Sequence, residues 1–147
     1  MPHILIINGP NLNLLGKRER ETYGETTLEE ITASLSARAA ELNVTVDCFQ
    51  SNSEGALIDC IQGAPGVSDG IIINPGGLTH SSVSLRDALL GVDLPFIEVH
   101  ISNIYAREEF RTHSVIADVA LGQISGLGPR GYLYALDSLV AYLTTRT

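Results

Sequence analysis

The sequence has little cysteine, no tryptophan and few basic residues. Its 147 residues include two cysteines, nine Lys and Arg, and seventeen Asp and Glu, which gives a formal net charge of −8. Two cysteines cannot form a disulfide framework, and Cys48 and Cys60 lack the C-x-x-C spacing of a metal site. Because both have apolar neighbours in the sequence, we expect buried free thiols in a reducing compartment. The acidic excess argues against nucleic acid as a partner, since binding to its backbone needs a basic face.

Long hydrophobic runs are also missing. No segment approaches the ~18 consecutive apolar residues of a membrane helix, so no membrane partner is predicted. Residues 1–7 lack the basic segment and the small-residue cleavage site of a signal peptide, and we expect a cytoplasmic protein. A hydrophobic content of 44% and a charged content of 18% exclude global disorder. The length fits a single domain, which we expect to span residues 1–147.

Short apolar runs alternate with helical patterns along the chain. Thr27 and Glu30 form a capping-box pattern before one helix, and Ser53 is a predicted cap of the next. Strands are predicted at residues 4–7, 44–49, 71–73, 95–99 and 119–125. Repeated strand–helix alternation indicates an α/β protein, with one parallel sheet covered by helices on both faces. The strand order 2-1-3-4-5 with right-handed crossovers gives a flavodoxin-like, five-stranded architecture.

Polar side chains follow the first four predicted strands. In an open α/β sheet, ligands bind beyond the carboxyl ends of the strands. The long segment 8–25 has no apolar period, and long loops of this kind are usually functional lids. Four segments therefore predict one binding site at this edge of the sheet. The polar residues concerned are Asn8, Asn11, Asn13, Lys17, Arg18, Tyr23, Gln50, Ser51, Asn52, Asn74, Thr79, His80, His100, Ser102, Asn103, Arg107 and Arg111.

The residue types allow specific chemistry, and each has a structural alternative. Glu98 and His100 share one side of a strand, so they form either a general acid with its orienting carboxylate or a structural ion pair. Arg107 and Arg111 are four residues apart, and they either bind an anion or belong to a solvated face. His80 alone is typical of a surface or capping residue. The glycines at 76 and 77 permit close approach to a ligand or form a plain turn, and the glycine-rich segment 126–131 favours a structural turn.

Tyr23 is the candidate base. A tyrosine titrates near pH ~10 in isolation, so work near neutrality requires a stabilised phenolate. Arg18 is five residues earlier, and a nearby guanidinium would favour the anion. The alternative is a packed tyrosine that anchors the lid.

Six ordered motifs cover essentially the whole chain. They are N-G-P-N-L-N-L-L-G at 8–16, R-E-x-x-x-Y-G at 18–24, Q-S-N-x-E-G at 50–55, I-N-P-G-G-L-T-H-S-S at 73–82, E-V-H-I-S-N at 98–103 and R-E-E-F-R at 107–111. Together they resemble the type II 3-dehydroquinate dehydratases. The resemblance implies a trans elimination of water from 3-dehydroquinate through an enolate, giving 3-dehydroshikimate without metal or cofactor. The reaction would serve the shikimate pathway or quinate catabolism.

The resemblance also implies catalytic roles. Tyr23 would remove a proton from the carbon next to the substrate ketone, and Arg18 would stabilise its anion and hold the closing lid. Asn11 would position a water that stabilises the enolate oxygen. His100 would protonate the departing hydroxyl, with Glu98 orienting the imidazole.

Further residues would bind the substrate, again by resemblance. Asn74, His80 and Arg111 would hold its hydroxyls. The backbone around Ile101 and Ser102, with the Ser102 hydroxyl, would bind its carboxylate. Asp87 would enter from a neighbouring subunit, because the family is similar in forming trimers that assemble into dodecamers, a tetramer of trimers.

Two departures from the family pattern stand out, and two other classes share the predicted sheet. Arg20 replaces a usual lid proline, and we expect a more mobile lid. Tyr105 replaces smaller residues, and we expect it to alter the approach to the pocket. An FMN-binding module would want a short, hydroxyl-rich loop after the first strand. A phospho-receiver would want an aspartate where Asn74 stands.

Overall fold

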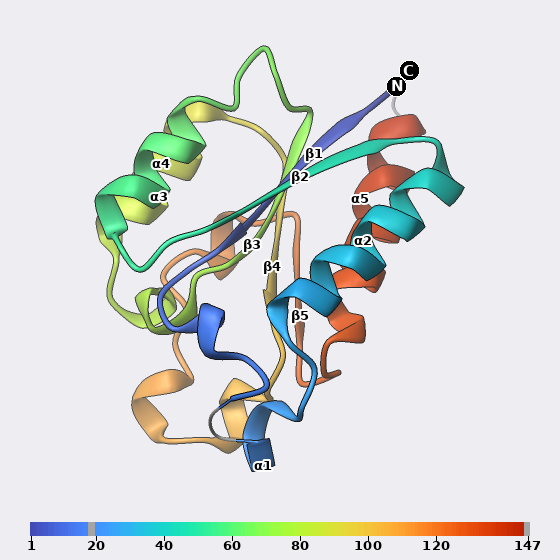
Figure 1. Cartoon of the computed structure of the whole chain (residues 1–147). Coiled ribbons are helices and arrows are strands. Elements are labelled where there is room, and N and C mark those ends of the chain that lie inside the picture. Colours follow the sequence, from blue (N-terminus) through green and yellow to red (C-terminus); the bar gives the residue numbers. More distant parts are fainter. Residues whose placement is uncertain (18–19, 146–147) are drawn as a thin grey trace.

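A five-stranded parallel sheet organises the chain (Figure 1). A computed structural model describes residues 1–17 and 20–145. The strands are β1 (His3–Asn8), β2 (Thr45–Gln50), β3 (Gly70–Asn74), β4 (Phe96–His100) and β5 (Gly122–Ser125). Their spatial order is β2-β1-β3-β4-β5, and every neighbouring pair is parallel. The flavodoxin-like prediction and its strand order are confirmed.

Helices cover both faces of this sheet. They are α1 (Arg20–Tyr23), α2 (Leu28–Leu42), α3 (Glu54–Gln62), α4 (Val83–Val92) and α5 (Arg130–Thr144). Helices α3 and α4 lie on one face, α2 and α5 lie on the other, and the short α1 lies beyond the carboxyl ends of the strands (Figure 1). Among the described residues, we find no helix long and apolar enough to cross a bilayer.

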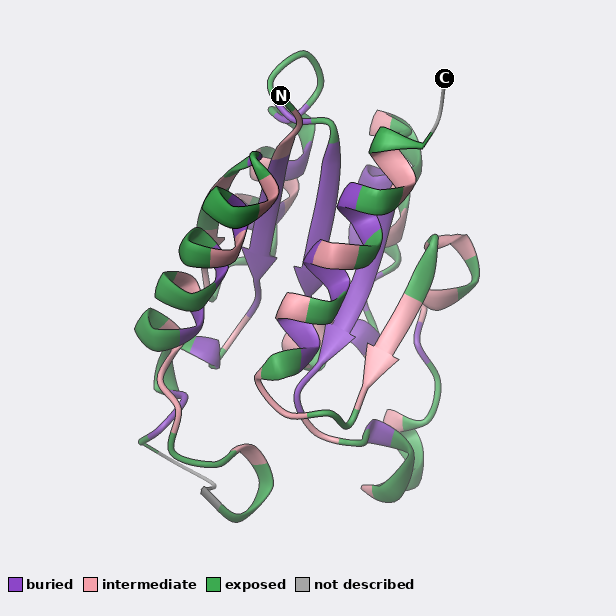
Figure 2. Cartoon of the chain, turned by 90° about the vertical axis from the view of Figure 1, so that its right-hand side faces the viewer, coloured by how far each residue is buried: buried purple, intermediate pink, exposed green. Residues whose placement is uncertain are grey.

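The continuous aliphatic run of β1 follows from this layering. Ile4 and Ile6 pack with α2 and α5, whereas Leu5 and Ile7 pack with α3 and α4. Successive strand residues point to opposite faces, so a strand covered on both sides needs apolar residues at every position. Figure 2 shows the result, with buried strands inside and exposed outer helix faces.

The predicted helix starts are confirmed. The Thr27 hydroxyl accepts a hydrogen bond from the Glu30 backbone N–H at 3.2 Å, and the Glu30 carboxylate accepts one from the Thr27 backbone N–H at 3.2 Å. The Ser53 hydroxyl accepts from the Ala56 N–H in the same way. Such caps satisfy backbone donors that have no partner within the helix, which explains why these starts are readable in the sequence.

Two expectations about local structure are wrong. The last strand begins at Gly122 instead of residue 119, because Ala117–Val119 form a 3-10 turn before it. The segment 8–25 is not free of structure either, since it contains the 3-10 turn Leu12–Leu14 and helix α1. Leu12 and Leu15 are buried and anchor this segment to the core on the α2 side of the sheet.

The expectation of two buried thiols is also wrong. Both cysteines are free, but Cys48 is exposed and Cys60 is only half-buried. Cys48 belongs to β2, which pairs with β1 alone and forms one edge of the sheet. An edge strand has fewer neighbours to cover it, so the alternation of its apolar residues does not guarantee burial.

The first strand begins and the last helix ends at the amino end of the sheet. Residue His3 opens β1 there, and α5 runs back so that Thr144 ends at the same side (Figure 1). The carboxyl ends of the strands, with α1 and most connecting turns, lie at the opposite end.

Candidate active site

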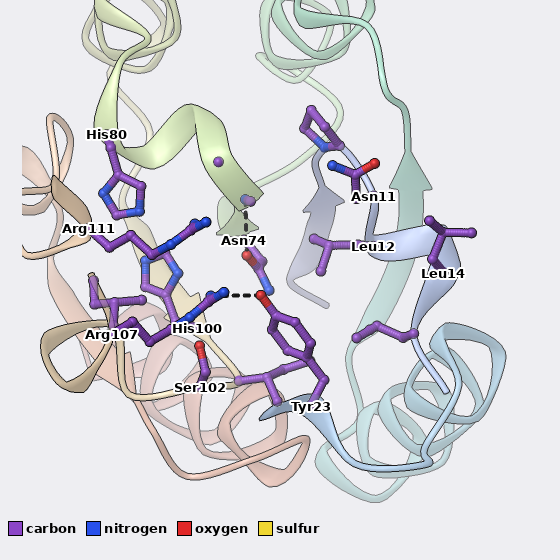
Figure 3. A pocket seen from close by; sticks show the side chains of 16 residues that line it. Asn11, Leu12, Leu14, Tyr23, Asn74, His80, His100, Ser102, Arg107 and Arg111 are labelled. Carbon is purple, nitrogen blue, oxygen red and sulfur yellow. Dashed lines mark hydrogen bonds between the residues drawn. The ribbon is translucent and has the colours of Figure 1, made fainter. Parts of the chain in front are cut away.

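A cleft lies at the carboxyl ends of β1, β3 and β4 (Figure 3). Its volume is about 240 Å³, which suits a small polar molecule better than a drug-sized one. Three stretches of chain that are distant in the sequence build it, and all three follow strand ends. The polar side chains that line it are Asn11, Tyr23, Asn74, His80, His100, Ser102, Arg107 and Arg111.

Two glycines allow the turn after β1 and the turn after β3 to approach each other closely. The Gly9 backbone N–H donates to the Asn74 carbonyl at 2.8 Å. A Cβ on Gly9 would lie 2.4 Å from the Pro75 carbonyl oxygen, and one on Gly76 would lie 2.8 Å from the Pro10 carbonyl oxygen. Gly76 also has a φ of +61°, which favours glycine. The close approach anticipated at residue 76 is therefore to another part of the backbone.

The phenol of Tyr23 lies against a guanidinium. Arg107 donates a hydrogen bond to the Tyr23 hydroxyl oxygen at 2.7 Å, and its charge lies 5.4 Å from the ring centroid (Figure 3). The predicted partner, Arg18, lies outside the described residues. Sequence reasoning considered Arg107 only as an anion binder or a solvated residue. The contact joins residues 84 positions apart, so no local pattern could reveal it.

A buried carboxylate holds the imidazole of His100. Glu98 is 0% exposed, and its Oε2 pairs with His100 Nε2. Ser114 donates to Glu98 Oε1 at 2.8 Å, and Gln123 donates to Oε2 at 2.9 Å. The predicted same-side placement of Glu98 and His100 is confirmed. Sequence reasoning did not identify Ser114 or Gln123.

These partners decide the charge state of Glu98. Burial alone would raise the pKa of this carboxyl, but hydrogen bonds and charge from His100, with hydrogen bonds from Gln123 and Ser114, outweigh it. The pKa of Glu98 therefore lies below its usual value, and the group is an anion near neutral pH. The ionised carboxylate accepts the hydrogen on His100 Nε2, which leaves Nδ1 as the ring nitrogen available to the cleft.

His80 and Arg111 lie on the same side of the cleft as His100, and neighbouring groups hold both (Figure 3). His80 Nδ1 bonds the His113 carbonyl oxygen at 2.9 Å, which requires a proton on Nδ1 and leaves Nε2 for a ligand. Arg111 donates from Nε to Glu108 at 2.7 Å, and this bond lowers the pKa of the Glu108 carboxyl. Both side chains are thus oriented before any ligand enters.

The floor of the cleft contains a buried polar triad. The Tyr132 hydroxyl donates to Asn8 Oδ1 at 2.6 Å and accepts from Asn74 Nδ2 at 2.9 Å. The side-chain oxygen of Asn74, Oδ1, accepts from the Gly76 backbone N–H at 3.2 Å. Burial raises the pKa of the Tyr132 phenol, so it stays neutral. Tyr132 belongs to α5, and sequence reasoning did not connect it with the cleft.

The remaining predicted residues take distinct places. Asn11 is exposed at the rim of the cleft, where its backbone N–H donates to Asn52 Oδ1 at 2.9 Å. Ile101 and Ser102 line the cleft beside His100. Asp87 does not line it and lies on α4, in a hollow between α3 and α4. Tyr105 does not line it either, and its expected effect on the approach to the pocket stays a prediction.

Within residues 1–17 and 20–145, no three His, Cys, Asp or Glu side chains are grouped as metal ligands. The cleft instead offers a phenol beside a cation, an imidazole beside an anion, and amide and guanidinium donors. Such a set can remove a proton at one side of a small ligand and deliver one at the other.

Comparison with known proteins agrees with this chemistry. Residues 2–140 match the family model described as Dehydroquinase class II. A 3-dehydroquinate dehydratase of Sodalis glossinidius is 58% identical over 143 residues, which cover 97% of this chain and 95% of that protein. A catabolic 3-dehydroquinase of Aspergillus oryzae is 55% identical over 143 residues, covering 97% and 94%. The crystal structure of a type II dehydroquinase from Butyrivibrio crossotus is 50% identical with a TM-score of 0.92, covering 94% of this chain and 97% of that one. The chain belongs to the class II dehydroquinase family.

Proposed function

We infer that this class II dehydroquinase removes water from 3-dehydroquinate to give 3-dehydroshikimate, and that it does so in the cleft at β1, β3 and β4. The activity follows from family membership. The observation that supports the site is the joint placement of Tyr23 and His100 on one small cleft. Elimination beside a ketone needs a base, an acid and a group that stabilises the enolate oxygen.

Tyr23 is the proposed base. Its oxygen accepts a hydrogen bond from Arg107, so a positive charge lies next to the atom that acts as the base. The phenolate takes a proton from the carbon next to the substrate ketone, which leaves an enolate. Arg18 is proposed as a second cation for this step and as the residue that holds the lid.

His100 is the proposed acid. The imidazolium, paired with Glu98, gives its proton to the hydroxyl that leaves as water while the enolate collapses to the conjugated product. One proton enters the protein at Tyr23 and one leaves at His100, so the reaction balances. The route uses side chains of this chain and calls on no metal or cofactor.

The other lining residues are proposed to hold the substrate. Asn11 positions the water that stabilises the enolate oxygen. Asn74, His80 and Arg111 bind hydroxyls, and the oriented His80 and Arg111 suit this role. The backbone at Ile101 and Ser102, with the Ser102 hydroxyl, binds the carboxylate.

We also propose an assembly and a compartment. Residues 1–147 act as one catalytic domain that forms trimers and then a dodecamer, with Asp87 completing the cleft of a neighbouring copy. The position of Asp87 outside its own cleft supports this arrangement. Free thiols at Cys48 and Cys60 support a reducing, cytoplasmic environment.

One assay tests the activity and the base together. Purified protein is mixed with 3-dehydroquinate, and the ultraviolet absorbance of the conjugated product is followed for the wild type and for Tyr23→Phe. We expect clear turnover that borohydride does not inhibit, with a severe loss in the variant. Absence of product from the wild type would reject the function, whereas near-normal turnover by Tyr23→Phe would reject only the base.

A second assay tests the acid. His100→Ala should still exchange the proton beside the ketone faster than it completes dehydration, because the step assigned to His100 comes after enolate formation. Equal losses of exchange and dehydration would contradict its assignment.

A further inference from the structure

Glu98 and His100 do not form an isolated pair. We propose that Gln123 is a positioning residue that holds Glu98 for His100, and that Tyr105 holds Gln123 in turn. The proposal rests on the function proposed above, in which His100 protonates the leaving hydroxyl. It assigns a role in the chemical step to two side chains outside the cleft lining.

The sheet places Gln123 directly beside Glu98. The two residues are register partners on the adjacent parallel strands β5 and β4. Gln123 Nε2 donates to Glu98 Oε2 at 2.9 Å, and His100 Nε2 pairs with the same oxygen. Ser114 occupies the other oxygen, Oε1, at 2.8 Å. Gln123 is therefore the donor that shares the catalytic face of the carboxylate with His100.

The orientation of the Gln123 amide is fixed from both ends. An ionised carboxylate only accepts hydrogen bonds, so the amide must turn its nitrogen to Glu98. The Tyr105 hydroxyl donates to Gln123 Oε1 at 2.8 Å and occupies the opposite end. Tyr105 itself is held where its backbone N–H donates to Asn103 Oδ1 at 3.1 Å. The hydrogen bonds thus run without a gap from a side chain that is 52% exposed to the imidazole in the cleft.

Sharing one oxygen has a consequence for proton donation. The Gln123 bond withdraws part of the negative charge that Oε2 presents to His100. Without this bond, the carboxylate attracts the proton on His100 Nε2 more strongly, so His100 gives its proton to the leaving hydroxyl less readily. The carboxylate also loses one of its three contacts. The other titratable and charged groups on the described cleft wall around His100 are Tyr23, His80, Arg107 and Arg111. Within the described residues, none of these four forms a hydrogen bond or ion pair with Glu98, so a neutral replacement of Gln123 acts on the Glu98–His100 pair and not on them.

The test compares Gln123→Met, Tyr105→Phe and the double variant with the wild type in 3-dehydroquinate dehydration. Met keeps the length of the side chain but donates nothing. We expect Gln123→Met to lower kcat roughly five- to tenfold with KM changed less than about twofold, as suits one lost hydrogen bond to a charged group. The alkaline limb of the kcat profile should move up by about 0.5–1 pH unit. Tyr105→Phe should show the same changes at about half the size on a logarithmic scale.

The double variant separates a relay from two independent effects. If Tyr105 acts through Gln123, Tyr105→Phe should cost nothing more once Gln123 is Met. Tyr134→Phe is the matched control, because Tyr134 is an exposed tyrosine of α5 that makes none of these contacts. Circular dichroism and thermal melting accompany each variant. If Gln123→Met does not fold, the surface variant Tyr105→Phe tests the proposal instead. Its kcat and the alkaline limb of its kcat profile are then compared with those of the wild type.

The outcomes are distinct. A wild type without turnover rejects the proposed function. An active wild type with unchanged kcat and pH profile in Gln123→Met, or with only a lower melting temperature, overturns the positioning role. Additive losses in the double variant overturn the link from Tyr105 through Gln123.

Discussion

Replacing Tyr132 by Phe removes a single oxygen from the floor of the cleft. That oxygen bonds two buried side chains, Asn8 at 2.6 Å and Asn74 at 2.9 Å. Asn8 is 2% exposed and Asn74 is 3% exposed, so water cannot readily replace the lost partner. The substitution therefore leaves one acceptor and one donor unsatisfied inside the protein.

The expected cost follows from those two groups. An unsatisfied buried donor or acceptor costs about 1–3 kcal/mol, and the phenylalanine ring recovers part of this because it has no hydroxyl to desolvate. We expect a loss of about 2–4 kcal/mol in the free energy of unfolding. For a chain of this size, that corresponds to a fall of roughly 5–15 °C in melting temperature. Turnover should fall as well, because Asn74 loses the bond that orients its amide.

Urea denaturation and thermal melting at one fixed protein concentration measure the loss, since any association between copies also stabilises the fold. Tyr134→Phe is the control, because Tyr134 lies on the same helix and is 43% exposed. A loss below about 0.5 kcal/mol for Tyr132→Phe, or one equal to that of the control, would show that the triad does not stabilise the cleft floor.

Three further predictions concern the backbone, the acid limit of stability and the lid. Gly9→Ala should lower the melting temperature and the activity together, because its Cβ would lie 2.4 Å from the Pro75 carbonyl oxygen; an unchanged melt would contradict this. Glu98 has a lowered pKa in the folded state, so its stabilising contribution is present above the ordinary glutamate pKa of about 4.3 and is lost as pH falls below it. Melts between pH ~5 and ~3 should therefore decline more steeply for the wild type than for Glu98→Gln, and parallel curves would refute the reasoning. Arg20→Pro should be accepted because Arg20 is the first residue of α1, where proline fits a helix, and it should change kcat by restricting the backbone; identical kinetics would count against a lid effect.

The elements that could be predicted are those whose signals are local. The aliphatic run in β1 and the Thr27–Glu30 capping box each depend on neighbours within a few residues, and both are confirmed. The predicted start of β5 was wrong because the apolar residues before this strand form a 3-10 turn that packs on the α3–α4 side of the sheet. The prediction that Cys48 is buried was wrong because the position of a strand at the sheet edge depends on the whole sheet.

The site divides in the same way. Glu98 and His100 could be paired from the two-residue alternation of a strand. Tyr23 meets Arg107 across 84 residues, and Tyr132 meets Asn8 across 124, so only the folded chain brings them together. Most residues that the motif resemblance named do line the cleft, because a family pattern reflects such long-range contacts without explaining them, whereas Asp87 does not line it.

The placement of the start of β1 and the end of α5 has a practical consequence. The start of β1 and the end of α5 lie at the amino end of the sheet, and the cleft opens at the carboxyl end (Figure 1). An affinity tag, a fluorescent fusion or a surface tether at either terminus is thus separated from the incoming substrate by the full length of the strands.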